Sequence, residues 1–242
     1  MNYSNYTYKH GVKDGLPIGL GYLSVSFAFG VTASSLGIPY FITLLISMTN
    51  LTSAGQLAGI SVIAAVGTIL EIILTQVVIN ARYFLMSLTL TQKLDKSFNT
   101  PARLFCAFGV TDEIFAVASS KKGVIGKRYF SGLMLLPYLG WATGTLLGAL
   151  AGNILPIELT NALGIALYAM FIAIIVPPSI KSKGVLFAVA VSAIISCCFY
   201  YIPIFSSLST GMAYIISAII SAVLTALIFP LKEEEADNNE RC

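Results

Sequence analysis

Long runs of apolar residues alternate along the chain with short polar or charged stretches. About 20 apolar residues cross the hydrocarbon of a bilayer as a helix, which rises about 1.5 Å per residue. Runs of roughly this length lie at residues 15–36, 67–90, 129–151, 159–176, 184–201 and 211–229. Two more apolar segments, 39–65 and 103–120, are interrupted by polar residues. The pattern predicts an all-α, polytopic membrane helix bundle with about seven or eight membrane helical segments, some interrupted or re-entrant.

The first interrupted segment, 39–65, carries a neutral polar patch at residues 47–56 that includes Asn50 and Gln56. Because none of these residues is charged, the patch can lie at membrane depth, where an unwound helix is tolerated if it lines a cavity or is buried in protein. Transporter sites are often built from such broken helices. The alternative is a plain external loop between two short helices.

The second interrupted segment, 103–120, is broken at Gly109 and has Thr111, Asp112 and Glu113 at its centre. One interpretation starts a half-helix at Thr111 inside the membrane, which places two carboxylates beside a substrate path. The other treats the acids as ordinary residues of a first helical turn, where they complement the helix dipole.

The run 67–90 carries a polar stripe. Glu71 and Arg82 are eleven residues apart, about three helical turns, so they share one line on the helix, and Gln76 and Asn80 lie between them. Charged residues inside a membrane usually face a protein interior or a water-filled path. Glu71 and Arg82 are too far apart to pair, so each needs another partner. The alternatives are that Arg82 reaches a lipid headgroup and that Glu71 is an interior acid satisfied by its neighbours.

The run 129–151 contains glycines spaced by four residues. Small residues at this spacing allow helices to approach closely in lipid, so we expect a helix-packing surface here. The glycines are Gly140, Gly144, Gly148 and Gly152.

Composition supports a membrane protein and excludes several other classes. Of the 242 residues, 57% are hydrophobic and only 10% are charged, against about 25% charged in a typical soluble domain. The chain has no basic patch interleaved with aromatic residues, the pattern that would predict nucleic-acid binding. The four cysteines suggest neither a disulfide framework nor a zinc site. His10 is the sole histidine, which excludes the HExxH motif and histidine-dependent triads. We therefore expect no enzyme activity, metal or cofactor.

Charge also predicts the organisation and orientation. Residues 1–14 form a polar N-terminal tail without a cleavable signal peptide, 15–230 the transmembrane transport domain, and 231–242 an acidic tail. Basic residues mark cytoplasmic loops, so Lys9 and Lys13 predict a cytoplasmic N-terminus, and the pattern after residue 129 predicts a cytoplasmic C-terminus. If the basic loops before and after segment 103–120 are both cytoplasmic, 103–120 must be re-entrant, and segment 39–65 must return to the side from which it entered. A weak parallel repeat, relating 30–39 to 148–156, would instead put Lys93, Lys96 and Arg103 outside.

Several short pieces, in order along residues 15–230, resemble the AzlC (also YgaZ) family, the large subunit of bacterial branched-chain amino acid exporters. The pieces are Gly15-Leu-Pro17, Ser53-Ala-Gly-Gln56, Thr75 with Asn80-Ala-Arg82, Thr111-Asp-Glu113, Trp141-Ala-Thr-Gly-Thr145, and Leu163-Gly164 leading to Phe171 and Val176-Pro177. The stretch 163–168 departs from the family pattern because it lacks the aspartate often found after that Leu-Gly. The resemblance implies export across the bacterial cytoplasmic membrane by secondary transport, with a small AzlD-like membrane partner. Secondary transport, which uses no ATP, agrees with the absence of a phosphate-binding GxxxxGK[ST] loop from the sequence.

A carrier of zwitterionic amino acids needs a donor for the carboxylate, an acid or carbonyl for the ammonium, and an apolar wall. The candidates for substrate binding are Asn50, Gln56, Asn80 and Arg82. The candidates for coupling are Asp112, Glu113 and Glu71, since a membrane-buried acid can carry a proton. The main alternative function is a non-transporting membrane scaffold or assembly subunit. The sequence leaves homo-oligomeric assembly open.

Overall fold

The computed structural model describes residues 6–230 except 153, 157, 160–161, 163–164, 166–171, 173–174 and 206–207. The chain divides into two compact units, Met1–Met170 and Phe171–Cys242. The described residues are almost entirely helical and contain one isolated bridge, between Leu94 and Ile125, instead of a sheet. This confirms the all-α prediction. The expected segment 159–176 and the acidic tail lie largely or wholly outside the described residues.

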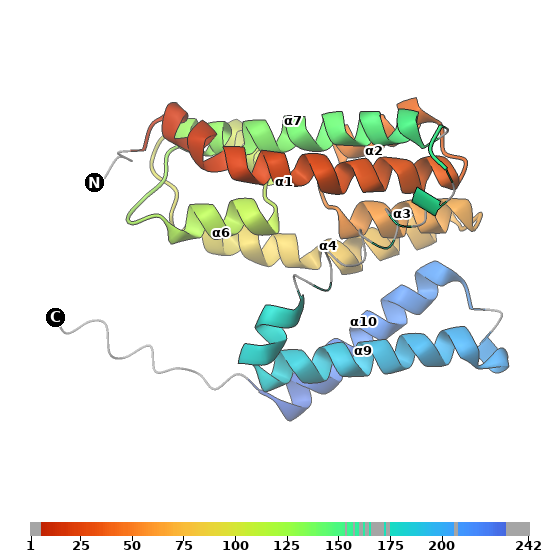
Figure 1. The fold of residues 1–242 in the computed structure, drawn as a ribbon. Helices are drawn as coiled ribbons and strands as arrows, with labels where there is room; N and C mark the ends of the chain where they lie inside the picture. The colour runs from red at the N-terminus through yellow and green to blue at the C-terminus, as the bar shows by residue number, and fades with distance from the viewer. Residues whose placement is uncertain are drawn as a thin grey trace. The chain divides into compact units, whose positions relative to one another are not determined.

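Three long helices run through the first unit from one end to the other (Figure 1). They are α1 (Tyr8–Ser35), α4 (Ile69–Thr91) and α7 (Lys127–Ala151), and each is long and apolar enough to span a membrane. Helix α1 begins at Tyr8, inside the stretch expected to be a polar tail. The reason is a capping box in which Thr7 and His10 satisfy each other's backbone N–H groups.

Two pairs of short helices lie between the long ones. The pairs are α2 (Tyr40–Thr49) with α3 (Ala54–Ala64), and α5 (Thr100–Phe108) with α6 (Asp112–Ser120). Both interruptions predicted from the polar patches are therefore confirmed, and Thr111 caps α6 as expected.

The α5–α6 pair is a re-entrant hairpin. The loop before α5 and the loop after α6 are bonded to each other: Ile125 N donates to Lys93 O at 2.8 Å, and Asp95 N to Ile125 O at 2.9 Å. The chain before α1 reaches the same end, where the Tyr6 hydroxyl donates to Lys122 O at 3.3 Å. We call this end, defined by Tyr6 and these two loops, the basic end. The loop placement drawn from the parallel repeat is wrong, because it would put Lys93 on the opposite side from the N-terminus.

The α2–α3 pair is a second hairpin, which enters from the other end. Helix α2 follows the end of α1 and reaches inward to Met48, whose carbonyl accepts from the Tyr138 hydroxyl of α7 at 3.2 Å. Helix α3 begins beside the middle of α4, where Gln76 Nε2 donates to Gly55 O at 2.8 Å, and it ends close to where α4 begins. The two hairpins thus enter from opposite ends, and their breaks lie inside the unit.

Helices α1 and α7 run parallel and in backbone contact (Figure 1). A Cβ atom on Gly140, Gly144 or Gly148 would collide with a backbone carbonyl of α1, and one on Gly152 would meet the Ser34 side chain. The glycines spaced by four therefore face a helix of the same chain, in the close packing that small residues allow in membranes.

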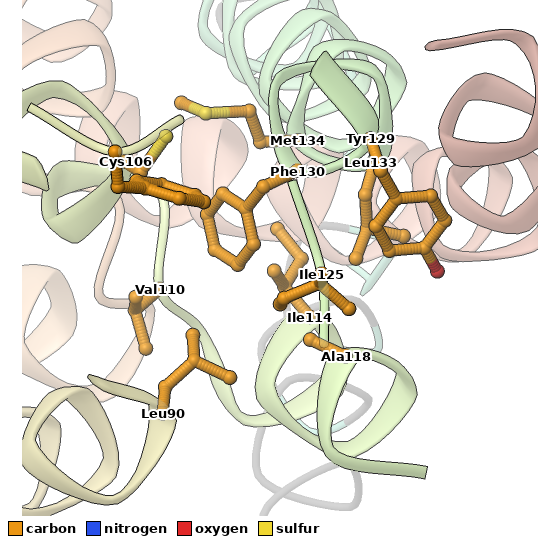
Figure 2. Close-up of a cluster of buried hydrophobic side chains, with 11 residues drawn as sticks. Leu90, Cys106, Val110, Ile114, Ala118, Ile125, Tyr129, Phe130, Leu133 and Met134 are labelled. Carbon is orange, nitrogen blue, oxygen red and sulfur yellow. The ribbon is translucent and has the colours of Figure 1, made fainter. Parts of the chain in front are cut away.

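An apolar cluster joins the α5–α6 hairpin to α7 and α4 (Figure 2). Ile114 and Ala118 of α6 pack against side chains at and before the start of α7, with Cys106 and Leu90 at the edge. The second unit contains an antiparallel pair, α9 (Lys183–Tyr201) and α10 (Thr210–Ile228), with a short 3-10 turn, η1 (Pro203–Phe205), between them. These helices match the predicted runs 184–201 and 211–229.

Candidate substrate site between two broken helices

The break in the α2–α3 hairpin is held open by its own polar residues. Asn50 is extended, and its Oδ1 accepts from Thr52 Oγ1 at 2.8 Å, which competes with helical hydrogen bonding. Ser53 follows with φ of 42°, a left-handed conformation that costs a non-glycine residue about 1–3 kcal/mol. At the N-terminus of α3, Ser53 makes no side-chain cap hydrogen bond.

Side chains of the polar stripe on α4 form hydrogen bonds with residues of this break. Gln76 Oε1 accepts from Asn80 Nδ2 at 2.9 Å and from Asn50 Nδ2 at 3.3 Å, while the Tyr83 hydroxyl donates to Thr52 O at 3.3 Å. The stripe therefore supports irregular backbone inside an otherwise apolar unit, as buried backbone polar groups require.

Gln56 lies on the first turn of α3 and is 1% exposed. Its Nε2 donates to Ser47 Oγ at 2.9 Å, and that hydroxyl lies 2.8 Å from Thr145 Oγ1 of α7. Among the described residues, Gln56 Oε1 has no hydrogen-bond partner.

The break in the α5–α6 hairpin presents two acids to the long helices. Asp112 Oδ2 pairs with Arg82 Nη1 at 2.5 Å, and Arg82 Nη2 donates to the Tyr83 hydroxyl at 3.1 Å. The Tyr22 hydroxyl of α1 lies 2.7 Å from Thr111 Oγ1 and hydrogen-bonds the Glu113 carboxylate. Asp112 is thereby tied to α4, and Glu113 to α1.

Both breaks and all three long helices line one small pocket. Its lining residues are Tyr22, Leu51, Thr52, Ser53, Tyr83, Thr111, Asp112, Glu113 and Trp141. The space open to water is about 20 Å³, enough for about one water molecule. This space is much smaller than an amino acid.

The structure brings together Arg82, Asp112 and Glu113 but separates them from Glu71. Glu71 Oε2 accepts from Thr68 N at 2.7 Å in a capping box at the start of α4. The separation of eleven positions from Glu71 to Arg82 corresponds to roughly 16 Å of helix. Glu71 thus satisfies the first turn of α4, away from the acids of α6.

Asn50 and Gln56 line a second pocket, of about 200 Å³, which also includes Gly55 and Gln76. Its apolar wall is made by Ile46, Ile60, Ile63 and Ile72. Asn80 is not among the lining residues of either pocket, and its Nδ2 donates to Gln76 Oε1 beside Gly55.

Sequence reasoning missed three aromatic residues of the first pocket: Tyr22, Tyr83 and Trp141. Trp141 is 2% exposed, and its ring packs edge-on against Tyr22 at 5.1 Å between centroids. Among the described residues, its Nε1 has no acceptor. The available signal was their position near the middle of apolar runs, because a buried tyrosine or tryptophan usually finds a polar partner.

The family model described as AzlC protein matches residues 17–155, which include both breaks and every lining residue of the first pocket. The chain belongs to the AzlC family. An uncharacterized membrane protein of Archaeoglobus fulgidus is 33% identical over 189 residues, 77% of this chain and 82% of that protein.

Two other relatives carry names. The AzlC-family chain is 28% identical to the inner membrane protein YgaZ of Escherichia coli, over 92% of this chain and 90% of that protein. It is 24% identical to the branched-chain amino acid transport protein AzlC of Bacillus subtilis, over 69% and 66% respectively. No solved structure matches the chain.

Proposed function

We propose that this protein is the large subunit of a secondary transporter that exports branched-chain or similarly apolar amino acids across the cytoplasmic membrane. The observation that carries the proposal is the pocket at which two broken helices meet, with carboxylates, hydroxyls and a helix N-terminus inside an apolar unit. A zwitterion requires groups of both polarities in one place, and broken helices supply them at membrane depth.

Transport is proposed to be driven by the proton-motive force. The chain has no GxxxxGK[ST] loop for ATP. Asp112 is the first candidate for the coupling acid and Glu113 the second, because both line the pocket. Glu71 is dropped from this role because it caps α4 away from the pocket.

The family resemblance implies a small AzlD-like membrane partner, which we include in the proposal. The glycines from Gly140 to Gly148 are not its docking surface, because α1 covers them. The basic end is proposed to face the cytoplasm, since Lys9, Lys13 and the two basic loops gather there. The C-terminus is proposed to lie on the same side, as the charge pattern predicts.

A counterflow assay in proteoliposomes tests the proposal. The chain is reconstituted with and without its partner, loaded with a panel of amino acids, and scored for uptake of labelled leucine, isoleucine and valine. We expect uptake that requires this chain and falls when Glu113 is replaced. A non-transporting scaffold is the rival. It would be supported if the partner alone transported at the rate of the complex.

A further inference from the structure

We propose that the pocket binds its amino acid in one orientation, with the carboxylate at the N-terminus of α3 and Trp141 and the ammonium at Glu113 of α6. This inference rests on the proposed function, because it concerns how the same site holds a zwitterion. It assigns the carboxylate to a different group from the arginine that the sequence suggested.

The N-termini of α3 and α6 both border the pocket but differ in charge. The first turn of α6 is capped by Thr111 and already carries Asp112 and Glu113. At α3, Ser53 makes no side-chain cap hydrogen bond and the first turn has no acid, although Gly55 N donates to Thr52 O at 3.2 Å. A helix N-terminus offers free N–H groups and a partial positive charge, so an anion is favoured at α3 and is opposed by the carboxylates at α6.

Trp141 supplies an independent indication of an acceptor. The indole N–H is a donor only, and here it is buried, borders the same pocket, and lacks a partner within the described part of the chain. Buried donors are nearly always satisfied. A carboxylate at the start of α3 would provide the missing acceptor.

Glu113 is suited to the ammonium because it lacks a cation. Within the described ranges, its hydrogen-bond partner is the neutral hydroxyl of Tyr22, whereas Asp112 is already paired with Arg82. Arg82 in turn is neutralised by Asp112 and stacks over Tyr83 at 4.8 Å. The unbalanced charge in this pocket is therefore negative and sits on Glu113, which attracts an ammonium group.

Two analogues of leucine separate the two ends of the substrate. In 4-methylpentanoate the ammonium is missing, and in 3-methylbutylamine the carboxylate is missing. Binding of leucine and of both analogues is measured on the purified full chain with its partner, for wild type, Trp141→Phe and Glu113→Gln. Tyr138→Phe is the control for Trp141. Tyr138 lies on the same helix as Trp141 but outside the pocket lining, and its hydroxyl donates to Met48 O. Glu71→Gln is the control for Glu113.

We expect Trp141→Phe to lower the affinity for leucine and 4-methylpentanoate by roughly tenfold or more and to leave the affinity for 3-methylbutylamine unchanged. Glu113→Gln should lower the affinity for leucine and 3-methylbutylamine, and it should leave the affinity for 4-methylpentanoate unchanged or raise it. The orientation is overturned if each variant weakens both analogues equally, if the pattern is reversed, or if neither variant affects leucine.

The emission of Trp141 gives a second measurement, which does not depend on analogue affinity. Trp141 is the chain's sole tryptophan, so the difference between wild-type and Trp141→Phe spectra isolates it from the partner. Leucine should shift this difference spectrum at the concentrations at which it binds; an unchanged spectrum overturns the contact. A wild type that binds no amino acid contradicts the proposed function itself, whereas leucine binding with indifferent variants contradicts the orientation alone.

Discussion

Arg82 of α4 and Asp112 of α6 form an ion pair, with Nη1 and Oδ2 2.5 Å apart, that connects the polar stripe of α4 to the break in the α5–α6 hairpin. The two side chains are 38% and 33% exposed, so the pair does not lie deep in the core, and Asp112 but not Arg82 lines the pocket. Its two charges cancel locally, and Tyr83 holds the second nitrogen of the guanidinium. Asp112 rather than a lipid headgroup is therefore the partner of Arg82.

The first prediction follows from this pair. Arg82→Leu leaves Asp112 without its cation, and we expect transport to fall to background while membrane expression stays near normal. For a pair this exposed, the stability loss should be modest, about 1 kcal/mol. Arg82→Lys should be impaired as well, because an ammonium cannot reach Asp112 and Tyr83 with two separate nitrogens.

The double variant Arg82→Leu/Asp112→Leu is the control, measured by transport rate and by melting temperature in detergent. It should be more stable than Arg82→Leu alone, because it removes the orphaned carboxylate. Arg82→Leu protein that transports at the wild-type rate would contradict a functional role for the pair.

The two helix breaks were predictable because their causes are local. At the first break Thr52 hydrogen-bonds Asn50, and Ser53 adopts a non-helical backbone. At the second break Thr111 is a normal helix cap. Such effects act within a few residues, so the amino-acid sequence shows them directly. The length and polarity of the long apolar runs likewise identify most of the helices.

The meeting of the two breaks was not predictable in the same way. Arg82 and Asp112 are separated by 30 residues, and nothing in either neighbourhood identifies the other as its partner. Glu71 and Arg82 share a polar stripe, yet Glu71 caps its own helix. Trp141 stands in the apolar run 129–151, and only the packing of α1 against α7 places it beside Tyr22.

The second prediction concerns coupling. Asp112→Asn should remove the dependence of net efflux on an imposed pH gradient while sparing exchange of substrate for substrate. Exchange requires binding and the conformational change but no net proton release. Efflux is measured at several pH gradients and exchange at none, with Glu71→Gln as the control that retains gradient dependence. If Asp112→Asn efflux still follows the gradient as in the wild type, the coupling group lies elsewhere.

The third prediction tests the two re-entrant hairpins. Single cysteines replace Lys96, Lys122, Gly37 and Val66 in a chain from which the native cysteines have been removed. A membrane-impermeant thiol reagent should label positions 96 and 122 from the cytoplasmic side and positions 37 and 66 from the outside. The reason is that the first two lie in the loops of the basic end, and the last two at the opposite end. Labelling of 96 and 122 from different sides would contradict the α5–α6 hairpin.

The fourth prediction concerns the contact of α1 with α7. Gly148→Ala would push a methyl group into the carbonyl of Phe27, and overpacking of this kind costs about 1–3 kcal/mol. Gly21→Ala is the matched control, since no atom lies within 4 Å of a Cβ built there. Melting in detergent should separate the two variants. Turnover per folded molecule should be similar in both, so a selective loss of turnover in stable Gly148→Ala protein would refute a purely structural role.

The last prediction compares two helix caps of the same chemistry. Thr111 caps α6 at the pocket, where Ile114 N donates to its Oγ1, and Thr68 caps α4 through Glu71 N. Replacement by valine keeps the shape of the side chain and removes the cap, at a cost of about 1 kcal/mol in either helix. We therefore expect Thr111→Val and Thr68→Val to lower the melting temperature by comparable amounts, and the two serine variants to restore it. Substrate affinity should separate them, because the Thr111 hydroxyl also contacts Tyr22, which holds Glu113, whereas Thr68 lies outside the pocket lining. Weaker leucine binding in Thr111→Val alone supports the site between the breaks, and equal weakening in both variants would show that affinity merely follows stability.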